Sequence, residues 1–153
     1  MFSCGSRFQV ALSPGSAVTV NSGSNTVTVS GLSAQVTVNG NQGGVNVRGV
    51  SGPLQVSTGS GSVTGTAIRS SAAQVTTNQG SADISFAAAP RSVTVRCSTG
   101  NATVRVPASG HHYHVLVSSG TGNASSKVPD APQAGSVVQV TSGSRDATVL
   151  PAS

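Results

Sequence analysis

The side chains best suited to chemistry are three imidazoles and a phenol that lie together in the C-terminal half of this chain of 153 residues. His111 and His112 precede Tyr113, and His114 follows it. Alternate side chains of a β-strand face the same way, so His112 and His114 would share one side and could begin a metal site. A complete site takes further ligands, and no carboxylate is near in sequence. We therefore expect no bound metal and name His112 and His114 as the candidate ligands.

Carboxylate chemistry has only Asp83, Asp130 and Asp146 to draw on. A glycosidase pair needs two carboxyl groups within about 10 Å. Asp83 and Asp146 fall in the same turn position of different repeats, which we expect to lie about 19 Å apart. The sequence has no nucleophile-elbow motif, and no Gly-rich turn continues into the Lys-Ser or Lys-Thr pair of a phosphate-binding loop. We expect no enzyme and no cofactor.

Strands and tight turns must position these side chains, because no stretch keeps apolar residues at helical spacing and Gly supplies 19 residues. The apolar residues repeat in register with Gly-rich turns. The first apolar residue after each turn defines a marker position, occupied by Val27, Val45, Val63, Ile84, Ala102, Ala124 and Ala147. Nine residues before the markers lie Val18, Val36, Leu54, Val75, Val93, Val115 and Val138. Residues seven before and two after most markers are also apolar, as Val20 and Val29 show.

Polar residues separate these apolar positions, so one face of each strand is buried and the other is wet. Stacked copies would bury a continuous core and pair their backbones about 4.8 Å apart. We predict an all-β fold with a parallel β-solenoid of about seven coils, 18–23 residues each, over residues 16–153, and an N-terminal strand or cap over residues 1–15. We expect Gly in the turns for its positive φ. An antiparallel sandwich or meander is the alternative.

The segment Arg96–Pro107 resembles the signature R-T-G-S-G-D-V-T-V-R-L-P of a bacterial family of β-strand repeat proteins labelled adhesins, a domain of unknown function with G-S-G-D-V repeats. Gly49–Val56 and Tyr113–Val117 are also similar to that family, and the resemblance extends from Val18 to Val149. It implies a repeat fold and an adhesin-like role without established chemistry. The family's frequent Asp after the turn is mostly replaced here by Thr, Gly, Ser or Asn, so an acidic ladder for cations is not expected.

Insertions between repeats fall on one edge of the predicted solenoid, and its two ends would expose unpaired strands. We predict an interaction edge that displays Arg69, His111, His112, Tyr113 and Asp130. We predict assembly ends at Phe8, Val10, Leu12 and Val149, since Phe8–Leu12 alternates like a strand and Val149 lies near the C-terminus. The favoured function is a structural rod that associates with itself, with end-to-end filaments as one form of that association. The alternative is a monomeric cell-surface module that recognises a glycan or protein through the interaction edge.

The formal net charge of +5 comes from eight basic residues that are spread along the chain. Charge alone would suit an anionic glycan or cell-surface polymer, whereas nucleic acid is not favoured because the basic residues form no run. No apolar stretch approaches the roughly 18 residues of a membrane-spanning helix. Met1–Arg7 lacks the layout of a secretion signal. We expect an extracellular or cell-surface location and leave the cytoplasm open.

Overall fold

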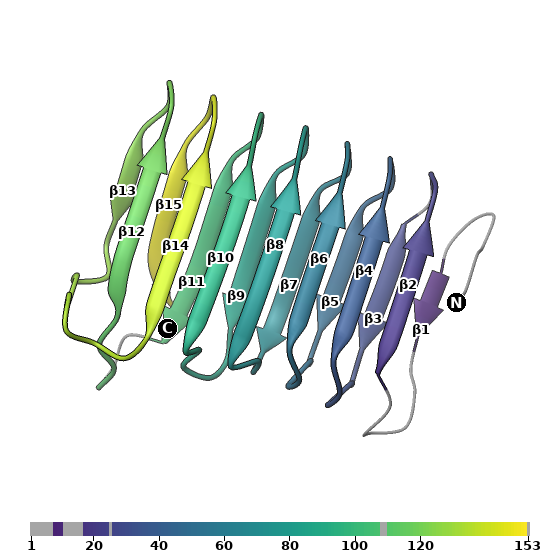
Figure 1. Cartoon of the computed structure of the whole chain (residues 1–153), viewed down its shortest axis with the longest axis horizontal. Helices are drawn as coiled ribbons and strands as arrows, with labels where there is room; N and C mark the ends of the chain where they lie inside the picture. The colour runs from purple at the N-terminus through teal and green to yellow at the C-terminus, as the bar shows by residue number, and fades with distance from the viewer. Residues whose placement is uncertain (1–7, 11–16, 25, 108–109, 153) are drawn as a thin grey trace.

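The chain forms a parallel β-solenoid in which two sheets face each other (Figure 1). A computed structural model describes residues 8–10, 17–24, 26–107 and 110–152. The seven-stranded sheet contains β2 (Val18–Ser22), β4 (Val36–Gly40), β6 (Leu54–Thr58), β8 (Ala72–Thr77), β10 (Ser92–Cys97), β12 (His114–Ser119) and β14 (Val137–Ser142). The eight-stranded sheet contains β1 (Phe8–Val10), β3 (Val27–Ser30), β5 (Val45–Arg48), β7 (Val63–Ile68), β9 (Ala82–Phe86), β11 (Ala102–Pro107), β13 (Ala124–Ser126) and β15 (Ala147–Ala152). A coil is one strand of each sheet with the turn that joins them.

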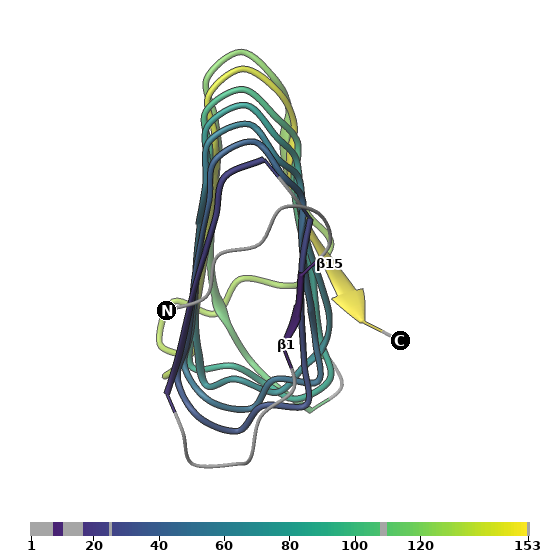
Figure 2. The same cartoon turned by 90° about the vertical axis from the view of Figure 1, so that its right-hand side faces the viewer.

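Equivalent apolar residues of neighbouring coils stack on one another, as the repeat predicts. Val36 of β4 pairs in parallel register with Leu54 of β6, and all four side chains of Val36, Val38, Leu54 and Val56 are buried. Viewed along the rod, the coils superpose as flattened loops around this core (Figure 2). The parallel pairing confirms the solenoid and excludes the antiparallel alternative. Among the described residues there is no helix that could cross a membrane.

The coils do not stack in the order in which they occur in the chain. The strand orders are β10-β14-β12 in one sheet and β11-β15-β13 in the other. The C-terminal coil, β14 with β15, therefore lies between the coil of β10 and β11 and the coil of β12 and β13. Its register fits both neighbours, because Val138 pairs with Val93 on one side and with Val115 on the other.

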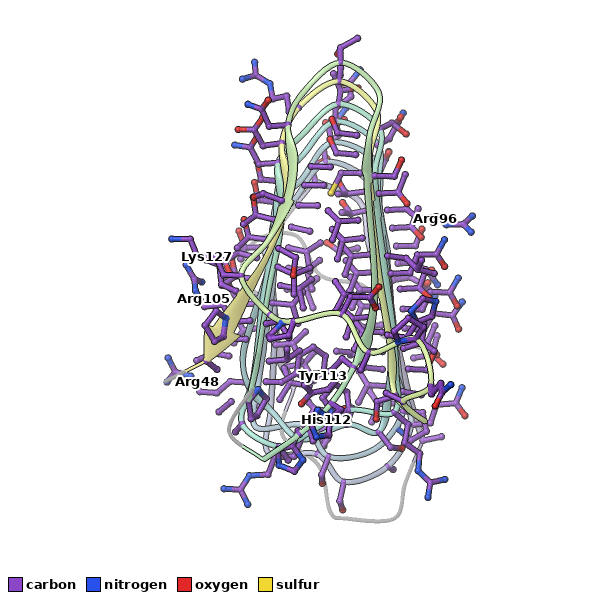
Figure 3. The ribbon with its side chains drawn as sticks, turned by 90° about the vertical axis from the view of Figure 1, so that its left-hand side faces the viewer. Arg48, Arg96, Arg105, His112, Tyr113 and Lys127 are labelled. Carbon is purple, nitrogen blue, oxygen red and sulfur yellow. The ribbon has the colours of Figure 1, made fainter. Side chains whose placement is uncertain are left out.

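The predicted assembly end at Val149 is wrong for this reason. Val149 lies in β15, pairs with Val104 and with Ser126, and is fully buried. The outermost coil at this end of the rod is instead β12 with β13. Residues 127–136 cross from one sheet to the other over that end, as Figure 3 shows, and Val128 of this segment is buried.

At the opposite end, Phe8–Val10 forms β1 and pairs with Val27–Val29 of β3. The strand predicted near the N-terminus is therefore present, as the edge strand of the eight-stranded sheet. Leu12, the other residue predicted at this end, lies outside the described residues, as does most of the predicted cap over residues 1–15.

One coil has a register different from the prediction. Ala82, not Ile84, aligns with Val63 and Ala102, so the coil of β8 and β9 is shifted by two residues. This shift places Ile84 beside Gly65, where a Cβ on the glycine would come within 3.1–3.3 Å of the Ile84 side chain. The large side chain thus fills the space that the missing one leaves. The shift also moves Asp83 out of the turn and into β9.

The Gly-rich turns stack too closely to hold side chains. A Cβ at Gly80 would overlap the carbonyl oxygen of Gly61, and one at Gly100 would overlap that of Gly80. The sequence prediction assumed that these glycines are needed for positive φ. This reason is wrong, because the positive-φ glycines of the described residues are Gly31, Gly49 and Gly110. Close stacking of identical turns therefore determines where Gly is needed.

Buried hydroxyl groups at the strand ends hold these turns. Thr77 and Ser142 face inward in the same column as Cys97, and the amide of Gly80 donates to Thr77 Oγ1 at 3.1 Å. The Ser142 hydroxyl donates to the carbonyl of Gly100 at 2.9 Å and accepts from the amide of Arg145 at 3.1 Å. Each hydroxyl fixes its own turn and contacts the next one in the stack.

The interior position of β15 can be tested at Val149. Val149→Ala should lower the free energy of unfolding by about 2 kcal/mol, because it removes buried methyl groups and leaves a cavity. Leu150→Ala changes the neighbouring outward side chain and should cost less than about 0.5 kcal/mol. Urea unfolding followed by circular dichroism measures both. Equal, small effects would mean that β15 lies at an open end.

Candidate functional site

The outer face of the eight-stranded sheet carries two columns of polar side chains, because alternate residues of each strand face solvent. The hydroxyl column consists of Thr28, Asn46, Thr64, Asp83, Thr103, Thr148 and Ser125. The basic column consists of Ser30, Arg48 and Thr66, then Ser85, Arg105 and Leu150, and ends at Lys127. The backbone amide of Lys127 donates to the carbonyl of Val149 at 2.9 Å, which places Lys127 beside Leu150.

Three cationic side chains share the basic column. Figure 3 shows Arg48, Arg105 and Lys127 on one side of the rod, with Arg96 of β10 on the opposite side. Arg105 forms an ion pair with Asp83, with 2.8 Å between Nη1 and Oδ1. Among the described residues, no carboxylate forms an ion pair with Arg48 or Lys127.

A hollow of about 480 Å³ surrounds Arg48 on this face. Its lining residues come from β3, β5 and β7 and are Thr28, Ser30, Asn46, Val47, Arg48, Thr64 and Thr66. Strand β7 leaves regular pairing at this place, since its register with β9 shifts between Gly65 and Ile68 and Ala67 has a φ of 54°. The hollow therefore lies where the sheet surface is least regular.

A second hollow, of about 470 Å³, lies on the outer face of the other sheet and includes Thr76, Arg96 and Thr141. Arg96 is the single cation of its column, which otherwise carries Asn21, Asn39, Ser57, Thr76, Thr141 and Ser118. The basic column thus carries three cations, whereas this column carries one.

The residues predicted to form the interaction edge do not all lie together, and Asp130 contacts β12. The His114 Nδ1 and Asp130 Oδ1 atoms lie 3.0 Å apart, and the same Asp130 oxygen accepts the Val115 amide at 2.9 Å. These bonds hold the pKa of Asp130 below its usual range, with the Val115 amide as the largest cause and His114 as the next. Asp130 thereby covers a backbone donor at the outer edge of β12.

Tyr113 is a core residue and not a surface contact. Its ring is fully buried between the sheets near the end of the rod (Figure 3), and its hydroxyl donates to the carbonyl of Pro107 at 2.6 Å. Burial raises the pKa of Tyr113. The prediction of Tyr113 as an exposed binding residue is therefore wrong.

The remaining predicted edge residues are exposed but scattered. His111 and His112 precede β12, whereas Arg69 lies in the connection from β7 to β8, near the middle of the rod. In the part of the chain that the structure describes, no three His, Cys, Asp or Glu side chains gather closely enough to hold a metal ion. His112 and His114 as metal ligands stay a prediction.

Cys97 is the nucleophile of highest intrinsic reactivity among the described residues, but its surroundings suppress that reactivity. The side chain is buried, and burial raises the pKa of its thiol to about 11. A reactive cysteine needs the thiolate and access to its target. Cys97 is therefore a small core residue of the turn column.

The basic column was not predicted as a site, although its signal is present in the sequence. Arg48, Arg105 and Lys127 each follow their marker residue, Val45, Ala102 or Ala124, by three positions. Because the marker residues stack on one another, this shared spacing indicates that the three cations lie on one face.

Comparison with known proteins gives one match. The family model described as Toastrack DUF4097 matches residues 12–149. This match confirms the resemblance to a repeat domain of unknown function, while its description contains neither the adhesin label nor the G-S-G-D-V motif. No curated protein and no solved structure matches the chain.

The role of Asp130 can be tested by amide hydrogen exchange. Asp130→Ala should make the Val115 amide exchange about tenfold faster at neutral pH, because it removes that amide's acceptor. In the wild type, protection of this amide should persist above the ordinary carboxyl pKa and be lost as pH falls through the lowered pKa of Asp130. Asp146→Ala is the matched control, since Asp146 accepts the Asn123 amide at 2.9 Å. An unchanged Val115 rate in Asp130→Ala would contradict the assignment.

Proposed function

Since this chain belongs to the Toastrack DUF4097 family, whose description names no reaction or ligand, its function must be sought in its own surface, and we propose that it is a non-enzymatic, adhesin-like rod that binds anionic polymers. The binding surface is the basic column. The proposed ligand is a cell-surface or extracellular polymer. We propose that the protein itself is also extracellular or attached to the cell surface.

The observation that carries this proposal is the repeated placement of positive charge along one line. Arg48 and Arg105 are three strands apart in the sheet and Arg105 and Lys127 two strands apart, which corresponds to about 14 Å and about 10 Å. A polymer with repeated negative charges can contact Arg48 and Lys127 at once, and Arg105 lies between them with its charge paired to Asp83. Each added contact then raises the overall affinity without a deep pocket.

The groups that could support catalysis are used in other ways. Asp83 is paired with Arg105, Asp130 accepts a backbone amide of β12, and the thiol of Cys97 is buried with a raised pKa. A general base or nucleophile needs a free reacting atom beside a space for substrate. These arrangements support a structural role for the acidic residues and for Cys97.

Charge reversal on the two outer faces tests the proposal. Arg48→Glu with Lys127→Glu should weaken binding to immobilised polygalacturonate or polyphosphate at least tenfold at low salt, because two contacts become repulsive. Arg96→Glu with Arg145→Glu changes the net charge equally on other surfaces and should have a much smaller effect. Biolayer interferometry at several salt concentrations measures both variants. Equal losses would show that only net charge matters and would overturn the proposed binding face.

Association of rods is a second candidate, now through the N-terminal end alone. The backbone groups of Thr19 and Asn21 point away from β4, and no described residue pairs with them. Such an open edge can accept a strand of a second copy. The opposite end is covered by residues 127–136, whose Ala131 amide donates to the carbonyl of Tyr113.

Sedimentation velocity over a range of concentrations tests this association. The wild type should form dimers at high concentration, and Thr19→Pro should weaken them strongly because it removes one of the two outward N–H groups of β2 and places a ring at the edge. Thr19→Val keeps that donor and is the control. A wild type that stays monomeric at every concentration would exclude association by this edge.

A further inference from the structure

The hollow around Arg48 contains polar side chains that have no hydrogen-bond partner among the residues that the structure describes. The hydroxyls of Thr28, Ser30, Thr64 and Thr66 and the amide of Asn46 form no side-chain hydrogen bond with any described residue. Polar side chains in other columns do form such bonds, as the pair of Asn39 with Asn21 at 3.0 Å shows. The hollow thus presents several hydrogen-bond donors and acceptors beside the guanidinium of Arg48, and none of them has a partner among the described residues.

We propose that this hollow binds an acidic sugar unit of the polymer. Hydroxyl and amide groups both donate and accept, so Thr28, Asn46 and Thr64 can pair with ring hydroxyls, which have the same dual character. The planar guanidinium of Arg48 donates two parallel hydrogen bonds to a carboxylate or a phosphate group. This inference rests on the proposed function, which supplies the anionic polymer, and adds the chemical class of its repeating unit.

The dimensions of the hollow suit a sugar unit. Its lining spans three neighbouring strands, β3, β5 and β7, which corresponds to roughly 10 Å across the sheet. The Val47 side chain is buried in the core, so a sugar ring in the hollow would meet polar side chains and Arg48. Ser30 and Thr66 lie on either side of Arg48 in the basic column, so hydroxyl groups flank the charge on both sides.

A polyanion without hydroxyl groups would leave some polar groups of this hollow without a hydrogen-bond partner. Polyphosphate offers acceptors to Arg48 but no donors for the hydroxyl oxygens or for the amide oxygen of Asn46. Those groups would lose contact with water without a full replacement, which costs binding energy. A nucleic acid base would need an aromatic side chain to stack on, and the hollow has none among its lining residues.

The test compares ligands of equal charge on two matched variants. Isothermal titration calorimetry measures binding of an oligogalacturonate, a sugar-phosphate oligomer and a polyphosphate with the same number of charges. The wild type should bind at least one of the two saccharides about tenfold more tightly than polyphosphate. The oligogalacturonate arm tests a carboxylate as the charged group, and the sugar-phosphate arm tests a phosphate.

Thr28→Val with Thr64→Val removes two hydroxyls without changing charge or shape. This variant should lose the preference for the saccharide, with polyphosphate binding unchanged. Thr103→Val with Thr148→Val makes the same change in the hydroxyl column outside the hollow and should keep the preference. A wild type without a saccharide preference, or a preference that survives in Thr28→Val with Thr64→Val, would overturn the sugar site. Polyphosphate binding through Arg48 and Lys127 would still stand in either case, so the two proposals fail separately.

Discussion

The stacking of each residue on its equivalent in the next coil, one strand spacing away, is the constraint on which this structure depends. It requires small aliphatic side chains inside, because every inward position has a copy directly above and below it. It also explains the turns, where Gly80 lies so close to Gly61 that no side chain fits between them. The hydroxyls of Thr77 and Ser142 satisfy the turn backbones in the same repeated way. Core, turns and backbone pairing are thus consequences of one spacing.

This constraint made the fold readable from the sequence but hid the order of the coils. Inward columns such as Val36 over Leu54 were predictable because they need only a shared pattern. The same pattern fits any coil against any other, so it cannot say that Val149 lies inside the rod. A slip of two residues likewise preserves alternation, which is why Ile84 could be mistaken for Ala82 until Gly65 showed where the large side chain fits.

The candidate site divides in a similar way. The alignment of Arg48, Arg105 and Lys127 follows from the repeat and needed only a count of outward positions. The hollow around Arg48 depends on the irregular backbone of β7 near Ala67, which no spacing rule predicts. Tyr113 was predicted at the surface for a related reason, since a phenol between histidines resembles a surface cluster, yet its ring fills the core beside residues 127–136. Outward side chains face solvent, so their chemistry can vary from coil to coil while the core stays uniform.

The inserted coil also changes how the rod can be built during synthesis. The ribosome makes β12 and β13 before β14 and β15, yet β14 and β15 lie between them and the rest of the stack. The nascent chain therefore cannot add its coils one upon another in order of appearance. The coil of β12 and β13 must either wait unpaired or rest temporarily on β10 and β11, and then make room. A chain interrupted before residue 137 would lack a middle layer and not merely its tip, which makes completion of the chain a precondition for the native stack.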